Sequence, residues 1–398
     1  MRRLIWIGLL AVFLKCGSDE TQSLVFWQFQ RPDIMEPIID EFERTHPGID
    51  VKVETLTWQS GFEKIVMAFS SGDVPDLLEL GSTWIGKFAA EGTLEDLSSL
   101  VEDMRADFMM WGLATFQGKT YGIPWLIGSR VLFYNRDLFR RGGLDPNEPP
   151  ETWDDLLRCA REIDAVGEDI YGFGMNAGER YVLYKKFMPF AWSAGGQILS
   201  DDLTRCVIDS PQNLEALKFY LSLKPFSVLD RQDMIDEMFK QGRVGMMISG
   251  GWNLKRIPED APDLDFGVAL VPRHASGQHI SFAGAEILVI PRGSQKQKAF
   301  ELARFLVRAE NALKIASEVK GVQPASRKAL YDPYYESHPM ERILLEQCMS
   351  SKSPPTSPRW VEIEEIINAR LEECLYGRLS PEEALSLMQD EISNLIAP

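Results

Sequence analysis

The chain has 398 residues, of which 45% are hydrophobic and 25% are charged, and its net charge is -17. A surface this acidic repels phosphate backbones, which argues against nucleic acid as a partner but does not exclude a small neutral ligand. A chain of this length exceeds the size at which a single core usually keeps growing, so two domains are expected.

The N-terminus has the pattern of an export leader. Two arginines precede an apolar run over 4–14 that is too short to span a bilayer. A lipoprotein signal would place a small residue before the modified cysteine, whereas Lys15 precedes Cys16 here. Two alternatives stay open, acylation of Cys16 or an ordinary secretory leader. The ordinary leader would be cut between Cys16 and Ser23. We expect a signal peptide at 1–15, a tether at 16–21 and an extracytoplasmic location, either periplasmic or lipid-anchored through Cys16.

Behind the leader, predicted strands alternate with predicted amphipathic helices, which is the pattern of an α/β protein with mainly parallel sheets. Strands are expected at 24–29, 49–56, 77–80, 244–249 and 287–290. Helices are expected at 37–45, 61–71, 84–91, 153–166, 213–224, 234–241, 297–309, 359–376 and 381–396. Gly72 and Gly92 follow two of these helices, where glycine commonly ends a helix.

Cysteine and histidine spacing gives no sign of a metal site. Besides Cys16 the cysteines are far apart and form no CxxC pair, and the histidines show no ligand spacing, so no metal or other cofactor is expected. An oxidising compartment permits disulfides, free buried thiols are the alternative, and the sequence does not decide between them. The residues concerned are Cys159, Cys206, Cys348, Cys374, His46, His274, His279 and His338.

A series of segments runs in order through the mature chain: HPGIDVKVE, AFSSGDVPDLLEL, FAAEGTLEDLSSLV, GKTYGIPW, FKQGRVGMMISGGWNL, FAGAEILVIPRG and GVQPASRKAL. With these segments the chain resembles the extracellular solute-binding proteins of ATP-driven importers, in the carbohydrate-binding group that includes maltose-binding protein. The resemblance implies a two-lobed fold in which each lobe is a mainly parallel sheet flanked by helices, joined by a hinge crossed more than once. It implies an N-terminal lobe of 22–128 plus 283–328 and a C-terminal lobe of 129–282 plus 329–398.

Candidate ligand contacts follow from where ligands bind in such folds. In open α/β sheets they lie beyond the carboxyl ends of strands, and a sugar needs flat apolar surfaces for its C–H faces and polar groups for its hydroxyls. Residues after strand ends or near the hinge are therefore candidates: Trp27, Gln28, Trp58, Asp76, Trp84, Trp125, Trp192, Gly251, Trp252, Glu286 and Arg327. Each has a structural alternative, because tryptophans are often core residues, Asp76 can cap a turn, Glu286 can pair inside the hinge and Arg327 can be a surface charge.

The resemblance implies capture of a sugar or oligosaccharide and its delivery to the permease subunits of an ABC importer by lobe closure, with the protein acting as a monomer. One alternative is a ligand-binding sensor subunit of a signalling system, and another is a secreted glycoside-processing enzyme. Among 59 acidic residues a carboxylate pair is uninformative, and no nucleophile elbow, P-loop or HExxH motif is present, so no enzyme is predicted. A phosphate-bearing cargo would require clustered basic ligands, and the tryptophan content points away from it.

Overall fold

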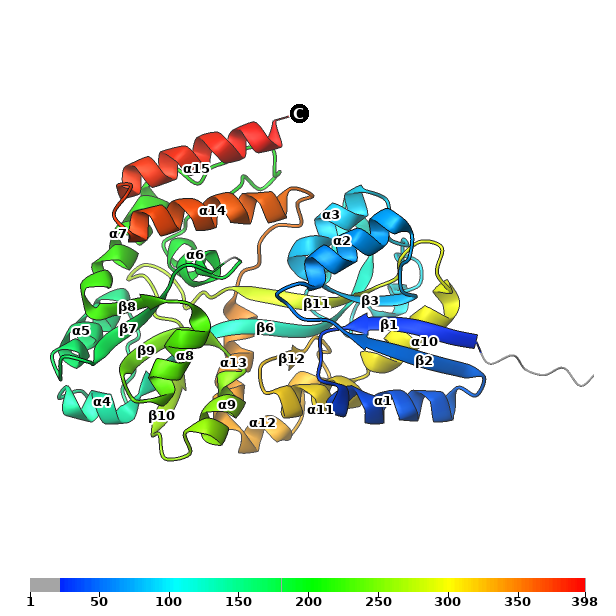
Figure 1. Cartoon of the computed structure of the whole chain (residues 1–398), viewed down its shortest axis with the longest axis horizontal. Coiled ribbons are helices and arrows are strands. Elements are labelled where there is room, and N and C mark those ends of the chain that lie inside the picture. The colour runs from blue at the N-terminus through cyan, green and yellow to red at the C-terminus, as the bar shows by residue number, and fades with distance from the viewer. Residues whose placement is uncertain (1–21, 180, 398) are drawn as a thin grey trace, which may run out of the picture.

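A computed structural model describes residues 22–179 and 181–397 as an α/β molecule whose two halves lie side by side along its long axis (Figure 1). The predicted signal peptide, Cys16 and the tether lie outside the described residues. Ten of the described strands form one sheet in which the order is β2-β1-β3-β11-β6-β9-β7-β8, with β10 and β12 paired to β6. The predicted α/β class is confirmed.

The first half is built on three parallel strands, β1 (Gln22–Gln28), β2 (Ile49–Thr55) and β3 (Leu77–Gly81). Its helices are α1 (Pro32–Thr45), α2 (Gly61–Ser71), α3 (Ile85–Ala90), α10 (Lys296–Leu306) and α11 (Ala309–Val319). Short strands β4 (Thr115–Phe116) and β5 (Lys119–Thr120) form a hairpin, and β12 (Gln323–Pro324) pairs with β6.

Local sequence signals explain most of these bounds. The predicted start of the first helix at residue 37 was wrong, because α1 begins at Pro32, where proline is tolerated in the first turn. Apolar residues three to four positions apart then face the core: Ile34, Met35, Ile38, Ile39 and Phe42 are all buried. Gly72 ends α2 with a φ of 80°, a left-handed conformation that glycine adopts without strain, as its position after the helix predicted.

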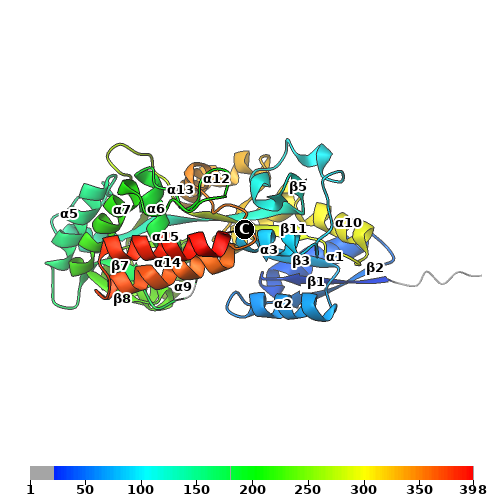
Figure 2. The ribbon, with the colours of Figure 1, turned by 90° about the horizontal axis from the view of Figure 1, so that it is seen from above.

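The second half repeats the arrangement with the parallel strands β7 (Tyr171–Asn176), β8 (Ser227–Asp230) and β9 (Val244–Gly250), and with β10 (Phe266–Ala269) antiparallel to β6. Its helices are α4 (Arg136–Arg141), α5 (Trp153–Asp164), α6 (Leu183–Ser193), α7 (Pro211–Ser222), α8 (Gln232–Lys240) and α9 (Asn253–Asp260). Seen from above, α5 and β2 lie at opposite ends of the molecule (Figure 2).

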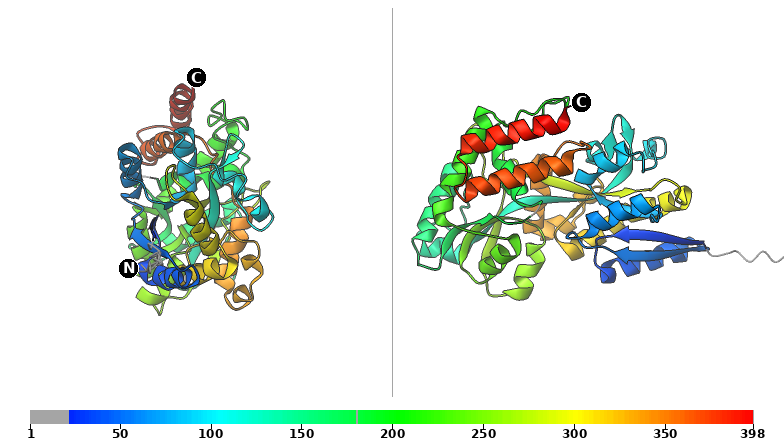
Figure 3. Two further views of the ribbon diagram at one scale, coloured as in Figure 1. Left: turned by 90° about the vertical axis from the view of Figure 1, so that its right-hand side faces the viewer. Right: turned by 45° about the horizontal axis from the view of Figure 1, so that its top comes forward.

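Four helices close the described part of the chain. They are α12 (Tyr334–Ser337), α13 (Pro339–Ser350), α14 (Trp360–Leu375) and α15 (Pro381–Ile396). Helices α14 and α15 lie side by side, the first packed on α6 and the second on α7 (Figure 3). None of the described helices combines the length and the apolar character that a membrane span requires.

Two strands connect the halves, β6 (Gly122–Asn135) and β11 (Ala283–Val289). Strand β6 pairs with β11 as far as Ser129 and with β9 from Arg130 onward, so it exchanges one antiparallel neighbour for another in mid-strand. The predicted lobe boundaries at 128/129 and 282/283 lie beside this exchange, and they remain predictions.

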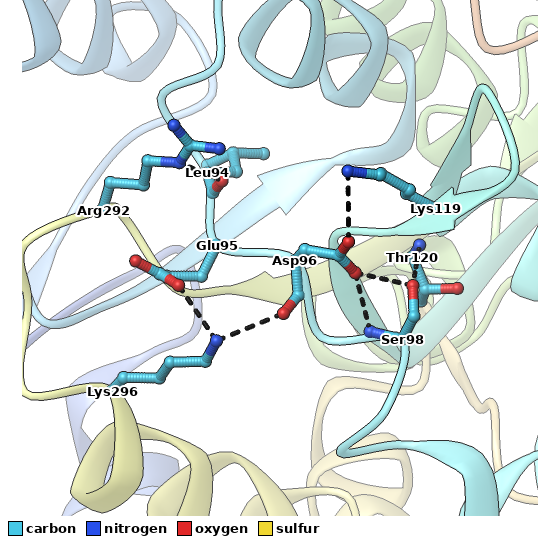
Figure 4. A network of polar contacts seen from close by, with 8 residues as sticks. All are labelled: Leu94, Glu95, Asp96, Ser98, Lys119, Thr120, Arg292 and Lys296. Atoms are coloured by element: carbon cyan, nitrogen blue, oxygen red, sulfur yellow. Dashed lines mark hydrogen bonds and ion pairs between the residues drawn. The ribbon is translucent and has the colours of Figure 1, made fainter.

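A polar network fastens the loop after α3 to the rest of the first half (Figure 4). Lys296 donates to a carboxylate oxygen of Glu95 at 3.0 Å and to the backbone oxygen of Asp96 at 3.2 Å. The Asp96 carboxylate accepts from the Ser98 hydroxyl at 2.6 Å, and that hydroxyl accepts from the Thr120 amide at 3.0 Å. These hydrogen bonds, with the ion pair to Lys119, join α10, the loop and the β4–β5 hairpin.

The four cysteines of the described residues are free and buried: Cys159, Cys206, Cys348 and Cys374. Burial raises the pKa of each thiol, to about 11 for three of them and to about 12 for Cys348. At neutral pH they are therefore protonated apolar groups within the core. Of the two alternatives left open by the sequence, the structure shows free thiols at these four positions rather than disulfides.

A capping box at α5 generates a stability prediction. The Thr152 hydroxyl accepts from the Asp155 amide, and the Asp155 carboxylate accepts from the Thr152 amide in return. Thr152→Ala should lower the free energy of unfolding by about 1 kcal/mol, since it leaves a helical N–H without a partner. Urea unfolding measures this change. Thr152→Ser, which keeps the hydroxyl, should stay close to the wild type, and equal losses in both variants would contradict the capping role.

Candidate functional site

One face of the two connecting strands carries residues from both halves. It consists of Gly128 and Arg130 on β6, Phe282 just before β11, and Gly284 and Glu286 on β11, and we call it the glycine face. Alternate residues of a strand share a face, and Gly284 lies directly opposite Gly128 in the antiparallel register. The Arg130 amide donates to the Phe282 backbone oxygen at 3.3 Å. An arginine and an aromatic ring therefore stand at one end of the face and a carboxyl group at the other.

The two glycines leave open space at the centre of this face. A Cβ atom on Gly128 would meet no atom within 4 Å. A Cβ atom on Gly284 would meet only atoms at ordinary contact distance, the Phe282 ring at 3.5 Å and the Ser82 hydroxyl at 3.7 Å. Both glycines are partly exposed. Between Arg130 and Glu286 a ligand can thus approach the backbone of the sheet.

Trp252 borders the glycine face in the second half. It follows the carboxyl end of β9, and its ring lies against Gly250, where an added Cβ would come within 1.9 Å of it. Its indole N–H donates to the Asp236 carboxylate at 3.0 Å, which fixes the orientation of the ring. The Arg130 guanidinium lies 5.0 Å from the Trp252 ring centroid and 5.7 Å from that of Phe282. Because Trp252 is partly exposed, it offers a flat apolar surface beside a cation.

A linked pair of carboxyl groups borders the face in the first half. The side-chain nitrogen of Gln30 donates to the Glu79 carboxylate at 3.1 Å and to the Glu286 carboxylate at 2.9 Å. Glu79 also accepts from the backbone N–H of Phe29 at 2.8 Å. Burial, together with repulsion from Glu286, raises the pKa of Glu79, and burial raises the pKa of Glu286 to about 7. Glu286 is partly exposed and can therefore bond a ligand hydroxyl.

An aromatic cluster stands next to Glu286. Trp58 stacks on Phe29 with ring centroids 4.1 Å apart and an interplanar angle of 16°, and it lies 5.6 Å from Trp84. Gly81 pairs with Glu286 in the register, and a Cβ there would lie 3.4 Å from Trp58. Trp58 is 48% exposed and Trp84 is 7% exposed, so Trp58 is the ring of this cluster that a ligand can stack against.

Four predicted contacts are instead held inside the first half. Trp27 is buried in its core with Lys64 at 4.7 Å from the ring, and the fully buried Gln28 donates to Thr55 and accepts from the Gln30 amide. The Asp76 carboxylate accepts from the backbone amides of Val25 and Gln295. Trp125 is fully buried and donates to the Leu306 backbone oxygen at 3.2 Å. Internal bonds and packing occupy these side chains, so we leave all four out of the candidate site.

The remaining predicted residues also lie off the glycine face. Trp192 is 6% exposed and lies behind Phe282, with parallel rings 6.5 Å apart. An added Cβ on Gly251 would come within 2.4 Å of Leu344, so this glycine permits close packing. Arg327 is exposed, on a segment whose backbone bonds to that of Asp107. Of the predicted contacts, Trp252 and Glu286 border the open strip, and Trp58 and Trp84 adjoin it.

Sequence reasoning missed Arg130, Gln30, Glu79 and the two central glycines. A usable signal existed for Arg130, which is a single charge inside the apolar run LIGSRVLFYN. A charge in such a run is either paired within the core or faces an opening. Gly128 lies two residues before it and supplies that opening.

A family model of bacterial extracellular solute-binding proteins matches residues 28–313. The chain belongs to this family. Its resemblance to the solute-binding proteins of importers is confirmed, and so is the two-lobed fold class implied by that resemblance.

Named relatives of this solute-binding protein align over nearly its whole length. A putative binding protein of Brucella abortus is 29% identical over 392 residues, which cover 95% of this chain and 94% of that protein. A maltotriose-binding protein of Pyrococcus abyssi is 22% identical over an alignment that covers 95% of this chain and 83% of that protein. A crystal structure of an ABC transporter solute-binding protein from Thermotoga lettingae, bound with alpha-D-tagatose, superposes with a TM-score of 0.85 at 30% identity, covering 94% and 100%.

The raised pKa of Glu286 predicts a pH-dependent stability. Its folded pKa of about 7 exceeds the usual value near 4.5, so its contribution to stability is fully present below about pH 4.5 and is lost as pH rises through about 7. Glu286→Gln removes this ionisation. The unfolding free energy of the variant minus that of the wild type should therefore be larger at pH 8 than at pH 5, by at least about 1 kcal/mol. Urea unfolding at both pH values tests this expectation. The exposed Glu36→Gln is the control, and a gain that is equal at both pH values would refute the assignment.

Proposed function

We propose that this solute-binding protein captures a sugar or short oligosaccharide outside the cytoplasmic membrane and delivers it to the permease subunits of an ABC importer. The observation that carries the proposal is the open strip of the glycine face, bordered by an aromatic ring and polar groups from both halves. The maltotriose and tagatose ligands of its relatives support a carbohydrate as the cargo.

The proposed binding mode divides the sugar between the halves. Trp252 stacks on a C–H face of the ring, while Glu286 accepts from hydroxyl groups and Arg130 donates to them. Trp58 offers a second stacking surface for a longer ligand. Backbone atoms at the two glycines let the sugar lie close to the sheet.

Capture by closure follows from this division. A ligand that contacts both halves binds most tightly when they are close together, so it shifts the population toward a closed form. The permease then receives a protein whose shape depends on its cargo. We further propose that the protein acts as a monomer, binds no nucleic acid and performs no catalysis, since its family and named relatives are binding proteins. Acylation of Cys16 and a soluble periplasmic form remain the two alternatives for its location.

A titration series tests the binding mode. A thermal-shift panel of mono- and oligosaccharides identifies a binder, and calorimetry then compares variants with that sugar. Trp252→Ala should weaken binding by at least about 1 kcal/mol through lost stacking. Trp252→Phe should retain part of the affinity. Trp111→Ala is the matched control, because Trp111 is also partly exposed but bonds to Arg105 in the first half. Equal affinities for the wild type and Trp252→Ala would place the sugar elsewhere.

Closure has its own measurement. Small-angle scattering should give a smaller radius of gyration when the identified sugar is present at saturation. Superimposable curves with and without it would refute closure while leaving sugar binding intact.

A further inference from the structure

Three basic side chains interact electrostatically near the second-half end of the glycine face, and the proposed sugar contacts use only one of them, Arg130. Arg130 stands on β6, and Lys185 and Lys186 stand on the first turn of α6. The Lys185 ammonium lies 5.5 Å from the Phe282 ring centroid, the same ring that has the Arg130 guanidinium at 5.7 Å. Two positive charges are thus held within 6 Å of one aromatic ring beside the open strip.

These cations differ in their hydrogen-bond and ion-pair partners. The Lys186 ammonium donates to the Ile248 backbone oxygen at 2.7 Å. Arg130 makes one long bond of 3.3 Å to its neighbour's backbone oxygen, and its Nε atom is buried without an acceptor. Among the described residues, no carboxylate oxygen lies within 4.0 Å of the charged nitrogens of Arg130 or Lys185.

The carboxylates that act on these cations from further away have other hydrogen-bond partners. Asp236 accepts from the indole of Trp252 and also from Gln232 and Ser249. Glu364 accepts from the indole of Trp360 at 3.0 Å. Glu179 accepts from the Gln232 amide and the Asn176 side chain, both at 2.9 Å. These carboxylates attract the two cations weakly without forming ion pairs with them.

Arg130 and Lys185 are both partly buried, and partial burial without a close counter-ion is unfavourable for a charge. It lowers the pKa of Arg130 to about 10 and that of Lys185 to about 8, and repulsion from Arg130 adds to the second shift. A neutral sugar can accept hydrogen bonds from these groups but brings no compensating charge. An anion supplies both hydrogen-bond acceptors and a compensating negative charge. A guanidinium with a free N–H edge can donate two parallel hydrogen bonds to the oxygens of a carboxylate or phosphate.

We infer that the captured sugar is an acidic one, whose carboxylate or phosphate group binds Arg130 beside Phe282 while Lys185 supplies a second positive charge. The inference rests on the proposed sugar-capture function and assigns a charge to the ligand. In this arrangement the acidic group faces the second half, and the rest of the sugar lies along the glycines toward Glu286.

Matched ligand pairs test this inference. Glucose and galactose are compared with glucuronate, galacturonate, glucose 6-phosphate and galactose 6-phosphate, and maltotriose is compared with trigalacturonate, by thermal shift and then calorimetry. An acidic member should bind at least tenfold more tightly than its neutral partner, and less so at higher salt. The carboxylate and phosphate arms show which acid group is recognised.

Variants locate the acid-binding group. Arg130→Gln should weaken binding of the acidic sugar at least tenfold, Lys185→Gln should weaken it less, and Arg130→Lys should retain part of the affinity. Lys218→Gln, which removes an exposed lysine paired with Glu382, is the matched control and should change nothing. Melting temperatures show whether each variant folds. Without ligand, Lys185→Met should melt higher than the wild type, because it removes a partly buried charge that has no carboxylate within ion-pair distance.

The outcomes separate the two proposals. Neutral sugars that bind as tightly as their acidic partners, or acidic binding unchanged in Arg130→Gln, would overturn the inference while sugar capture stands. If no member of either set binds, the proposed function itself fails. Acidic sugars that bind tightly and lose affinity in Arg130→Gln would support both.

Discussion

The site depends on a single strand that exchanges pairing partners in mid-course. Strand β6 is bonded to β11 up to Ser129 and to β9 from Arg130 onward, so its backbone remains hydrogen-bonded while it passes from one half to the other. Side chains on this strand consequently lie beside residues of both halves. Gly128 and Arg130 stand on either side of the exchange, and the candidate contacts are arranged around them.

Packing inside the two halves explains why few of the aromatic residues are available to a ligand. Trp125 points into the first-half core, and Trp192 is packed behind Phe282. Trp252 keeps part of its ring exposed because the missing side chain at Gly250 makes room for it and Asp236 holds its N–H. A ring held in place loses little conformational freedom on binding, so more of the stacking energy remains as affinity.

Local patterns predicted much of the fold but only part of the site. Amphipathic spacing and helix-ending glycines are short-range signals, and they located most helices and the three parallel strands of the first half. The long strand β6 was missed because its apolar run has no clear period. Asp76 is left out of the candidate site because it precedes β3, so it lies at the amino end of that strand, away from the carboxyl edge. Arg130 could not be placed, since its direction depends on the register of β6 against β11, which is long-range information.

The two ends of the glycine face differ in the charge they accept. At the first-half end, Gln30 links two carboxyl groups whose raised pKa values show that this position disfavours additional negative charge. At the second-half end, Arg130 and Lys185 have lowered pKa values, so that position disfavours uncompensated positive charge. A ligand with one acidic end compensates the positive charge only when that end faces Arg130. The reverse orientation would place a third acidic group beside Glu79 and Glu286. The electrostatics of the face thus favour one orientation of an acidic sugar before any contact to its hydroxyl groups is considered.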